Sequence, residues 1–435
     1  MRIAADLHIH SKYSRAVSPG MTLENIALWA EKKGIQVMGT GDFTHPQWFH
    51  EIKTKLEPEE EGLFKLKAGE VLHSSITGIT GNDSRMQNSA LSTRFLLTTE
   101  ISSIYSKGGK VRRIHNLVFA PSIETVEKIN TKLGWIGNLK ADGRPILGLD
   151  SKKLLKIVLD IDPRCVLAPA HAWTPWFSIF GSMSGFNSIE ECFEEMSPHI
   201  FAIETGLSSD PAMNWRLSVL DKISLISNSD SHSLQKLGRE ANVFDCELSY
   251  SGIIDAIKSK NPQKFLYTIE FFPEEGKYHY DGHRDCGVYF SPEETEGHNG
   301  TCPVCGRKLT VGVLNRVHEL ADRPIGGKPA NAIPFKNLIP LDEIIGEALG
   351  VGPKSKKVME EYEKLISKFG SELNILLNVP YDEIIQASGS RLAEAIKRVR
   401  EGKVNIRPGY DGEYGKISIF GEEGKIEENP QAKLF

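Results

Sequence analysis

Several features are missing from this sequence, and each absence narrows the possibilities. There is no run of about 18 apolar residues, so no transmembrane helix is predicted. No basic stretch followed by an apolar one precedes the first predicted strand, so we expect no signal peptide and a cytoplasmic location. The formal net charge is only -5 over 435 residues. That charge does not exclude nucleic acid as a partner, because a local basic face is sufficient to bind it.

Cysteine is scarce, with six residues in the chain. Three lie singly in apolar or helical contexts and are expected to be reduced core thiols: Cys165, Cys192 and Cys246. The other three are clustered, which in a reducing compartment indicates a metal site rather than disulfides.

The clustered cysteines have the spacing of a structural zinc site. His283-x-x-Cys286 is followed, after fifteen residues, by Cys302-x-x-Cys305. Two close ligand pairs separated in this way predict one tetrahedral zinc ion. His279 and His298 are alternative ligands, and the two-residue spacing to Cys286 favours His283. The polar, loop-like surroundings are expected to need the metal in order to fold.

The length predicts more than one domain. Residues 1–272 alternate short apolar runs with helical patterns, which predicts repeated strand–helix units around a parallel sheet. About seven such units favour a barrel, in which chemistry occurs at the carboxyl ends of the strands. A helix is expected in "TLENIALWAEKKG", with Thr22 as N-cap and Gly34 as its end. Residues 273–340 would form a zinc module and connector, and residues 341–435 a helical domain with a short tail.

Histidine and carboxylate side chains recur at the ends of the predicted strands. His8 and His10 follow the first strand, and an i, i+2 pair points to one face. The whole series is His8, His10, Asp42, His45, Glu100, His115, His171, Glu204, Asp230 and His232. Such a mixed set suits Zn, Mn or Fe, and ions about 3.5–4 Å apart can clamp phosphate oxygens. The alternative, that each is separately a polar strand-end residue, does not explain why they recur.

The motifs "DLHIHS", "GTGDFTHP", "TTEIS", "IHNLVF", "PAHAW" and "NSDSH" together resemble the polymerase and histidinol phosphatase (PHP) superfamily. These are phosphoesterases on a distorted seven-fold α/β barrel, and the resemblance covers roughly residues 1–270. It implies a first metal held by His8, His10 and Asp230 and a second held by His115 and His171, with Glu100 bridging the two. His232 would belong to a third. The expected cofactors are two or three divalent ions (Zn, Mn or Mg) besides the structural zinc.

The sequence departs from the superfamily pattern at the second motif. Phe43 follows Asp42 where a histidine is usual, and neither Ser14 nor Arg15 supplies the further ligand expected after the first pair. His45 is the candidate substitute, and two metals would then be the minimum. The expected catalytic residues are Asp230, His232 and Asp42, the last two as proton-transfer groups.

The C-terminal region contains a possible DNA-binding element. In "EALGVGPKSKKV", the turn at Gly350 and Gly352 before a helix resembles the helix-hairpin-helix of DNA-repair proteins. Backbone N–H groups there would face a phosphate, with added charge from Lys354, Lys356 and Lys357. The alternative is a plain helix connection, although Gly389 lies in a second similar turn.

Three further segments are candidate partner contacts. Lys110, Arg112 and Arg113 precede His115 and either bind the DNA backbone or are simply solvated. Trp173 and Trp176 either stack on a base or belong to a local core. The tail "QAKLF", Gln431 to Phe435, resembles peptides that bind sliding clamps.

The order of barrel, zinc module and hairpin-rich domain resembles repair endonucleases of the PHP superfamily. It implies hydrolysis of double-stranded DNA 5′ of deaminated bases (uracil, hypoxanthine, xanthine) and of abasic sites. The lesion pocket would lie among residues 43–94, the loop 172–188 and the zinc module. The residues alone predict a metal-dependent phosphodiesterase with a DNA-binding appendage. If the protein were a small-molecule phosphatase, the zinc module and the helical domain would have no evident function. If it were a non-catalytic accessory protein, it would not need so complete a set of metal ligands.

Overall fold

The computed structural model describes residues 1–69 and 91–421. Its largest sheet has eleven strands: β1 (Arg2–Asp6), β2 (Val37–Gly39), β3 (Leu56–Pro58), β4 (Leu63–Leu66), β5 (Arg94–Lys107), β6 (Lys110–Ala120), β7 (Ile146–Leu147), β8 (Val166–Pro169), β11 (Ala241–Asp245), β12 (Phe265–Glu270) and β15 (Phe335–Asn337). The main order is β15-β12-β11-β1-β2-β5-β4-β3, with β6 and β7 on β5 and β8 on β6. A separate pair joins β9 (Ala202–Glu204) to β10 (Ser224–Ile226).

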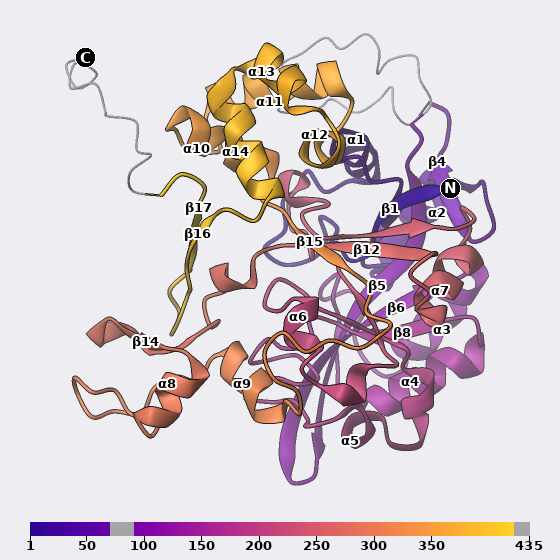
Figure 1. Ribbon diagram of the computed structural model, residues 1–435. Coiled ribbons are helices and arrows are strands. Elements are labelled where there is room, and N and C mark those ends of the chain that lie inside the picture. Colours follow the sequence, from indigo (N-terminus) through magenta and orange to yellow (C-terminus); the bar gives the residue numbers. More distant parts are fainter. Residues whose placement is uncertain (70–90, 422–435) are drawn as a thin grey trace.

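The expectation of a parallel sheet is only partly right. β1 pairs with β2, and β2 with β5, in parallel, but β1–β11, β11–β12, β5–β6 and β6–β8 are antiparallel. β5 and β6 form one long hairpin that projects downward in Figure 1. Gly108 and Gly109 connect them at φ 59° and 71°. Two positive φ values give the tight turn whose twist matches that of antiparallel strands. The α/β class is confirmed, and the seven-fold barrel stays a prediction.

Seven α-helices accompany these strands: α1 (Leu23–Lys33), α2 (Pro46–Lys55), α3 (Ile123–Gly134), α4 (Ser151–Ile161), α5 (Ile189–Phe193), α6 (Pro211–Asn214) and α7 (Tyr250–Ser259). The bounds predicted for α1 are confirmed: Thr22 accepts a hydrogen bond from the Asn25 N–H, and Gly34 ends the helix at φ 85°. α5 is short and is followed directly by a 3₁₀ helix, Glu194–His199, which contains Pro198.

The chain after β12 forms a small lobe and then a group of helices. The lobe contains β13 (Asp281–His283), β14 (Val288–Phe290), α8 (Pro292–Gly297) and α9 (Val313–Leu320). It is followed by α10 (Leu341–Leu349), α11 (Lys356–Phe369), α12 (Glu372–Leu377), α13 (Tyr381–Ser388), α14 (Ser390–Arg400), β16 (Asn405–Arg407) and β17 (Lys416–Ser418). Figure 1 shows the helices above the sheet and the lobe to its left. The domain boundaries at 272 and 340 remain predictions.

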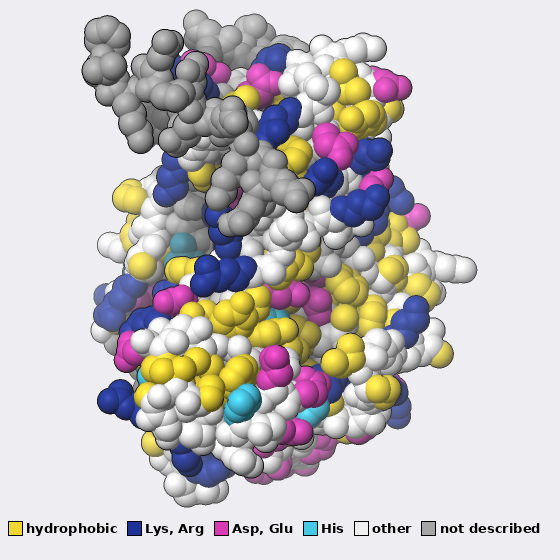
Figure 2. All heavy atoms as spheres, turned by 60° about the vertical axis from the view of Figure 1, so that its left-hand side comes forward, with side chains coloured by type: hydrophobic (Ala, Val, Ile, Leu, Met, Phe, Trp, Pro, Cys, Tyr) yellow, Lys and Arg dark blue, Asp and Glu magenta, His cyan; other side chains and the backbone are white. Residues whose placement is uncertain are grey.

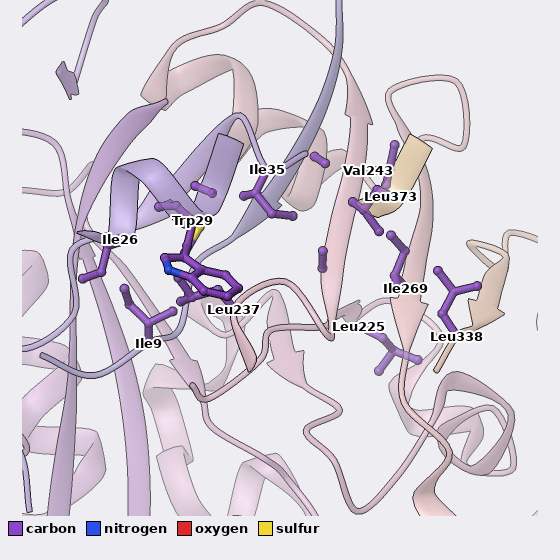
Figure 3. Close-up of a cluster of buried hydrophobic side chains, with 14 of the residues drawn as sticks. Ile9, Ile26, Trp29, Ile35, Leu225, Leu237, Val243, Ile269, Leu338 and Leu373 are labelled. Atoms are coloured by element: carbon purple, nitrogen blue, oxygen red, sulfur yellow. The ribbon is translucent and has the colours of Figure 1, made fainter. Parts of the chain in front are cut away.

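The C-terminal helices share a core with the sheet. In Figure 3, Ile26 and Trp29 of α1 lie with Ile9, and Leu373 of α12 lies beside Val243 of β11. Buried polar contacts join the same elements, since Lys33 Nζ lies 2.6 Å from Glu372 Oε2. In the described part of the chain, no helix has the length and apolar character required to cross a membrane.

Candidate active site and metal centres

Two groups of ligand-type side chains meet inside the sheet region. His8, His10 and Asp230 form one group, and the ligand atoms within it lie within 4.8 Å of one another. β1 ends at Asp6, and the chain continues to a β-bridge between Ile9 and Ser231. This bridge places Asp230 beside the two histidines although it is more than 200 residues away in sequence.

The second group is Glu100, His115 and His171, again with ligand atoms within 4.8 Å of one another. His171 follows β8, as expected for a strand-end ligand. Glu100 and His115 instead lie in the middle of β5 and β6, because both strands run on into the long hairpin. Their antiparallel pairing sets Glu100 opposite Leu117 and His115 opposite Ser102.

Glu100 connects the two groups. Its Oε2 atom lies 3.2 Å from His10 Nε2 and 3.6 Å from His8 Nε2. Its Oε1 atom lies 2.7 Å from His115 Nδ1 and 3.1 Å from His171 Nε2. One carboxylate therefore faces both groups with a different oxygen, which is the arrangement of a carboxylate that bridges two ions.

The first group has unsatisfied polar atoms of the kind that a cation would satisfy. His8 Nε2, His10 Nε2 and Asp230 Oδ1 are buried and have no hydrogen-bond partner of good geometry within residues 1–69 and 91–421. Buried polar groups normally have partners, and imidazole with carboxylate is a ligand set for Zn or Mn. Asp230 and His171 also adopt positive φ angles of 46° and 29°, and such strain is typical of functional sites. The residues present thus fit divalent ions.

Two further carboxylates orient the histidines of the first group. His10 Nδ1 donates to Asp42 Oδ1 at 3.0 Å, and His8 Nδ1 donates to Glu204 Oε1 at 3.0 Å. The second oxygen of Asp42 accepts from Ser11 N at 2.7 Å and from Ser14 Oγ at 2.9 Å. Asp42 lies behind His10, and both of its oxygens accept hydrogen bonds; its expected part in proton transfer stays a prediction. Glu204 had been noticed at a strand end without an assigned role.

His232 and His45 do not join a group of three ligands in the described part of the chain. The His232 ring lies 4.8 Å from the His10 ring, and its Nδ1 donates to the backbone oxygen of Asp230 at 2.9 Å. It is therefore beside the first group and partly exposed. The His45 ring stacks on Tyr13 at 4.5 Å, at the start of α2.

Arg144 belongs to the site, although the sequence analysis did not identify it. Its Nη1 atom lies 3.1 Å from Glu100 Oε2. Burial by itself would raise the pKa of Glu100, but His115, Arg144 and His8 hold that pKa well below its usual value. Burial lowers the pKa of His115 to about 4, which keeps a lone pair available on that ring. A single arginine in the polar stretch "LKADGRPIL" carries no local signal that could have identified it.

The predicted zinc ligands come together in the lobe. His283, Cys286, Cys302 and Cys305 have ligand atoms within 4.8 Å of one another. The two alternative histidines lie apart from this group: His298 stacks on Phe290 at 4.6 Å, and His279 is buried. Four ligands of this kind fit one structural zinc ion.

The residues expected to contact DNA have different environments. Lys354 is exposed between α10 and α11, Lys356 and Lys357 are exposed in the first turn of α11, and Gly350 ends α10 at φ 67°. Gly352 and Lys110 are also exposed, Lys110 at the tip of the hairpin. Arg112 and Arg113 are half-buried against aromatic rings, with Arg112 Cζ 4.0 Å from the Phe186 ring.

The two tryptophans of the loop after β8, Trp173 and Trp176, have different environments. Trp173 is fully buried, and its Nε1 donates to Asn214 Oδ1 at 2.7 Å. Of the two alternatives for Trp173, its burial therefore favours a place in the local core over stacking on a base. Trp176 is 38% exposed, and its ring lies 5.8 Å from Tyr278. The proposed clamp peptide, Gln431 to Phe435, lies outside the described residues.

The α/β fold and the paired ligand groups define this chain as a metal-dependent hydrolase of the phosphoesterase type. Two solved structures match it along almost its whole length. The lesion-specific endonuclease PfuEndoQ from Pyrococcus furiosus has a TM-score of 0.82 and 30% identity, over 99% of each chain. Endonuclease Q in complex with a 27-mer duplex that carries an abasic lesion at the active site has a TM-score of 0.81 and 31% identity, over 98% of this chain and 99% of that one. The chain belongs to the endonuclease Q family.

Other comparisons cover different shares of the chain. Residues 340–403 match the family model described as the MJ0043 C-terminal domain. An uncharacterized protein of Methanocaldococcus jannaschii, MJ0043, is 36% identical over 256 residues, which are 57% of this chain and 31% of that protein. This chain therefore spans about a third of that relative. The uncharacterized protein YqxK of Bacillus subtilis is 28% identical over 432 residues, which are 96% of this chain and 99% of YqxK.

Proposed function

We propose that this protein is a DNA repair endonuclease that hydrolyses the phosphodiester bond 5′ of deaminated bases (uracil, hypoxanthine and xanthine) and of abasic sites. The observation that carries this proposal is Glu100, which faces both ligand groups in a chain matched end to end by a lesion-specific endonuclease. The related complex with an abasic duplex supports double-stranded DNA as the substrate.

The six residues of the two groups would hold two divalent ions, with Glu100 between them, and His232 would contribute to a third if one binds. Such ions supply an activated water and neutralise charge on phosphoryl oxygens. Asp42 and Glu204 orient the rings of His10 and His8 through Nδ1. His232 is partly exposed beside His10, and its ring would exchange a proton with the leaving 3′ oxygen.

A cavity beside the second ligand group has the position and size for an extruded nucleotide. It has a volume of about 720 Å³ and is lined by the loop 174–177, by residues 271, 273 and 275–279 and by Tyr414. The Phe177 ring lies 4.8 Å from the His115 ring, which sets the cavity next to the metal ligands. Flipping a base out of the duplex into such a pocket lets an enzyme read its edge. Trp176 and Tyr278 offer aromatic surfaces there.

The C-terminal helices supply surface for the rest of the duplex. Figure 2 shows Lys and Arg side chains in the upper part of one face, at the level of these helices in Figure 1. Lys354, Lys356 and Lys357 at the α10–α11 turn would contact the phosphate backbone without reading sequence. Lys110, at the tip of the β5–β6 hairpin, would also contact the phosphate backbone. The His-Cys₃ group would hold the zinc ion that stabilises the lobe.

The proposal is tested with end-labelled duplexes that carry one deoxyuridine, one deoxyinosine or one abasic site, together with an undamaged duplex. Purified protein is assayed with Mn, Zn or Mg. The expected result is a nick immediately 5′ of each lesion and no nick in the undamaged control. Hydrolysis of a small phosphomonoester without a nick in any duplex would instead show a small-molecule phosphatase.

A further inference from the structure

Arg144 has most of its guanidinium free at the active site. Nη1 donates to Glu100 Oε2 at 3.1 Å, while Nε and Nη2 have no hydrogen-bond partner among residues 1–69 and 91–421. The Glu100 side chain is fully buried, whereas that of Arg144 is 29% exposed. The arginine therefore reaches from the solvent side of the site onto the carboxylate shared by both ligand groups.

The backbone on either side of Arg144 is anchored to the site. Gly143 N donates to Tyr13 O at 3.1 Å, and Thr44 Oγ1 donates to Gly143 O at 3.3 Å. On the other side, Ser102 N donates to Pro145 O at 3.0 Å. A Cβ atom at position 143 would lie 2.3 Å from Asp42 Oδ2, so the loop can approach this closely only because residue 143 is glycine. Arg144 is thus held in place and is not a flexible surface arm.

The shared carboxylate does not need Arg144 as a counter-ion once cations occupy the ligand groups. Glu100 already faces four histidine nitrogens with its two oxygens. Divalent ions held by these groups would neutralise the same carboxylate more strongly than a partly exposed guanidinium. Asp230 and Asp142 also act on Arg144 electrostatically, but neither accepts a hydrogen bond from its guanidinium among the described residues. A phosphate of the substrate could take up the two open donors, and the planar fork of arginine matches phosphate oxygens.

We infer that Arg144 is a catalytic residue that binds a non-bridging oxygen of the scissile phosphate and stabilises the charge that develops there. The inference rests on the proposed function, because it requires a phosphodiester between the two ligand groups. Preorganised donors of this type typically contribute a factor of about 10²–10³ to the rate.

The test compares the wild type with Arg144→Met, Arg144→Lys and a matched control, Arg164→Met. Arg164 also pairs with a carboxylate, Asp162 at 2.8 Å, but it precedes β8 whereas His171 follows that strand. Three quantities are measured: the single-turnover rate on an abasic duplex, the metal content of each protein, and the affinity for an uncleaved abasic duplex with a neutral methylphosphonate at the cleavage position.

We expect Arg144→Met to lower the rate by about 10²-fold or more, Arg144→Lys to recover part of the loss, and Arg164→Met to match the wild type. Metal content and methylphosphonate affinity should be unchanged in Arg144→Met, because the neutral group offers no charge to bind. A variant that loses metal and methylphosphonate affinity together would show that Arg144 only supports Glu100. Equal cleavage by wild type and Arg144→Met would overturn this inference alone. A wild type that nicks no lesion duplex would overturn the proposed function as well.

Discussion

The Nδ1 atom of His10 lies 3.0 Å from Oδ1 of Asp42, so the ring of His10 directs Nε2 toward Glu100 and Asp230. The same relationship holds between His8 and Glu204. A carboxylate on the far nitrogen fixes the tautomer and raises the basicity of the ligand nitrogen. The candidate metal centre therefore includes residues that touch no metal.

Replacing Asp42 by Asn should weaken metal binding by about 10–100-fold without unfolding the protein. The amide preserves the shape of the side chain but removes the charge that orients His10, and it presents an N–H group to donors from Ser11. Metal titration monitored by calorimetry measures the change. Unaltered metal affinity would contradict the supporting role, and Glu57→Gln on the surface serves as the control.

Asp230→Asn should abolish cleavage while leaving binding of lesion duplexes largely intact. Its Oδ1 atom lies 3.2 Å from His10 Nε2 and 3.6 Å from His8 Nε2, inside the first ligand group. Cleavage assays and fluorescence anisotropy on the same abasic duplex separate the two effects. Retained cleavage would remove Asp230 from the site.

Cys305→Ser should release one zinc ion per chain without affecting the metal content of the two ligand groups around Glu100. Cys305 is exposed, so the substitution opens no cavity, but it removes one of four ligands. Cys246→Ser is the matched control, because Cys246 is a free cysteine outside the ligand group. Zinc is quantified with a chromogenic chelator after each protein is dialysed, and equal zinc in both variants would disprove the structural site.

Replacing Lys354, Lys356 and Lys357 by Ala should weaken binding to damaged and undamaged duplexes alike. Each lost phosphate contact is expected to reduce the slope of log K against log salt by about 0.9. The control removes three exposed lysines of α3 and α4: Lys128, Lys153 and Lys156. The affinity of each variant for duplex DNA is measured at several salt concentrations. If both triple variants bind DNA with the affinity and salt dependence of the wild type, the helix-hairpin-helix interpretation is wrong.

Glu270→Gln should stabilise the protein at alkaline pH. Burial raises the pKa of Glu270 to about 8, and the carboxyl is hydrogen bonded to Thr205 and Thr268. Because the folded-state pKa exceeds the unfolded value, its contribution to stability is complete below about pH 4.5 and is lost as the pH rises through about 8.

The difference in melting temperature between Glu270→Gln and the wild type should therefore grow from pH 5 to pH 9, by about 2–4 °C per kcal/mol of stabilisation. Glu247→Gln, at an exposed position, is the control and should show no such trend. A difference that is constant across this pH range would show that Glu270 does not titrate in the folded protein.

Interactions between residues close in sequence were sufficient to predict several features of the structure. Thr22 and Gly34 set the ends of α1, because capping depends on neighbours within one helical turn. The spacing from His283 to Cys305 selected the four residues that meet in the lobe, since a metal site with two close pairs is largely local. The recurrent histidines and carboxylates indicated the chemistry of the barrel region by residue type alone.

Long-range packing decided what each residue does. Glu100 lies between His10 and His115 only because β5 joins β2 on one side and β6 on the other. Arg144 reaches Glu100 from 44 residues away, and Trp173 is buried by contacts that periodicity does not predict. The sequence thus determined which ligand types the protein carries, because ligand chemistry is a property of single residues. The tertiary structure decided which oxygen faces which nitrogen, because that depends on where distant strands place their side chains.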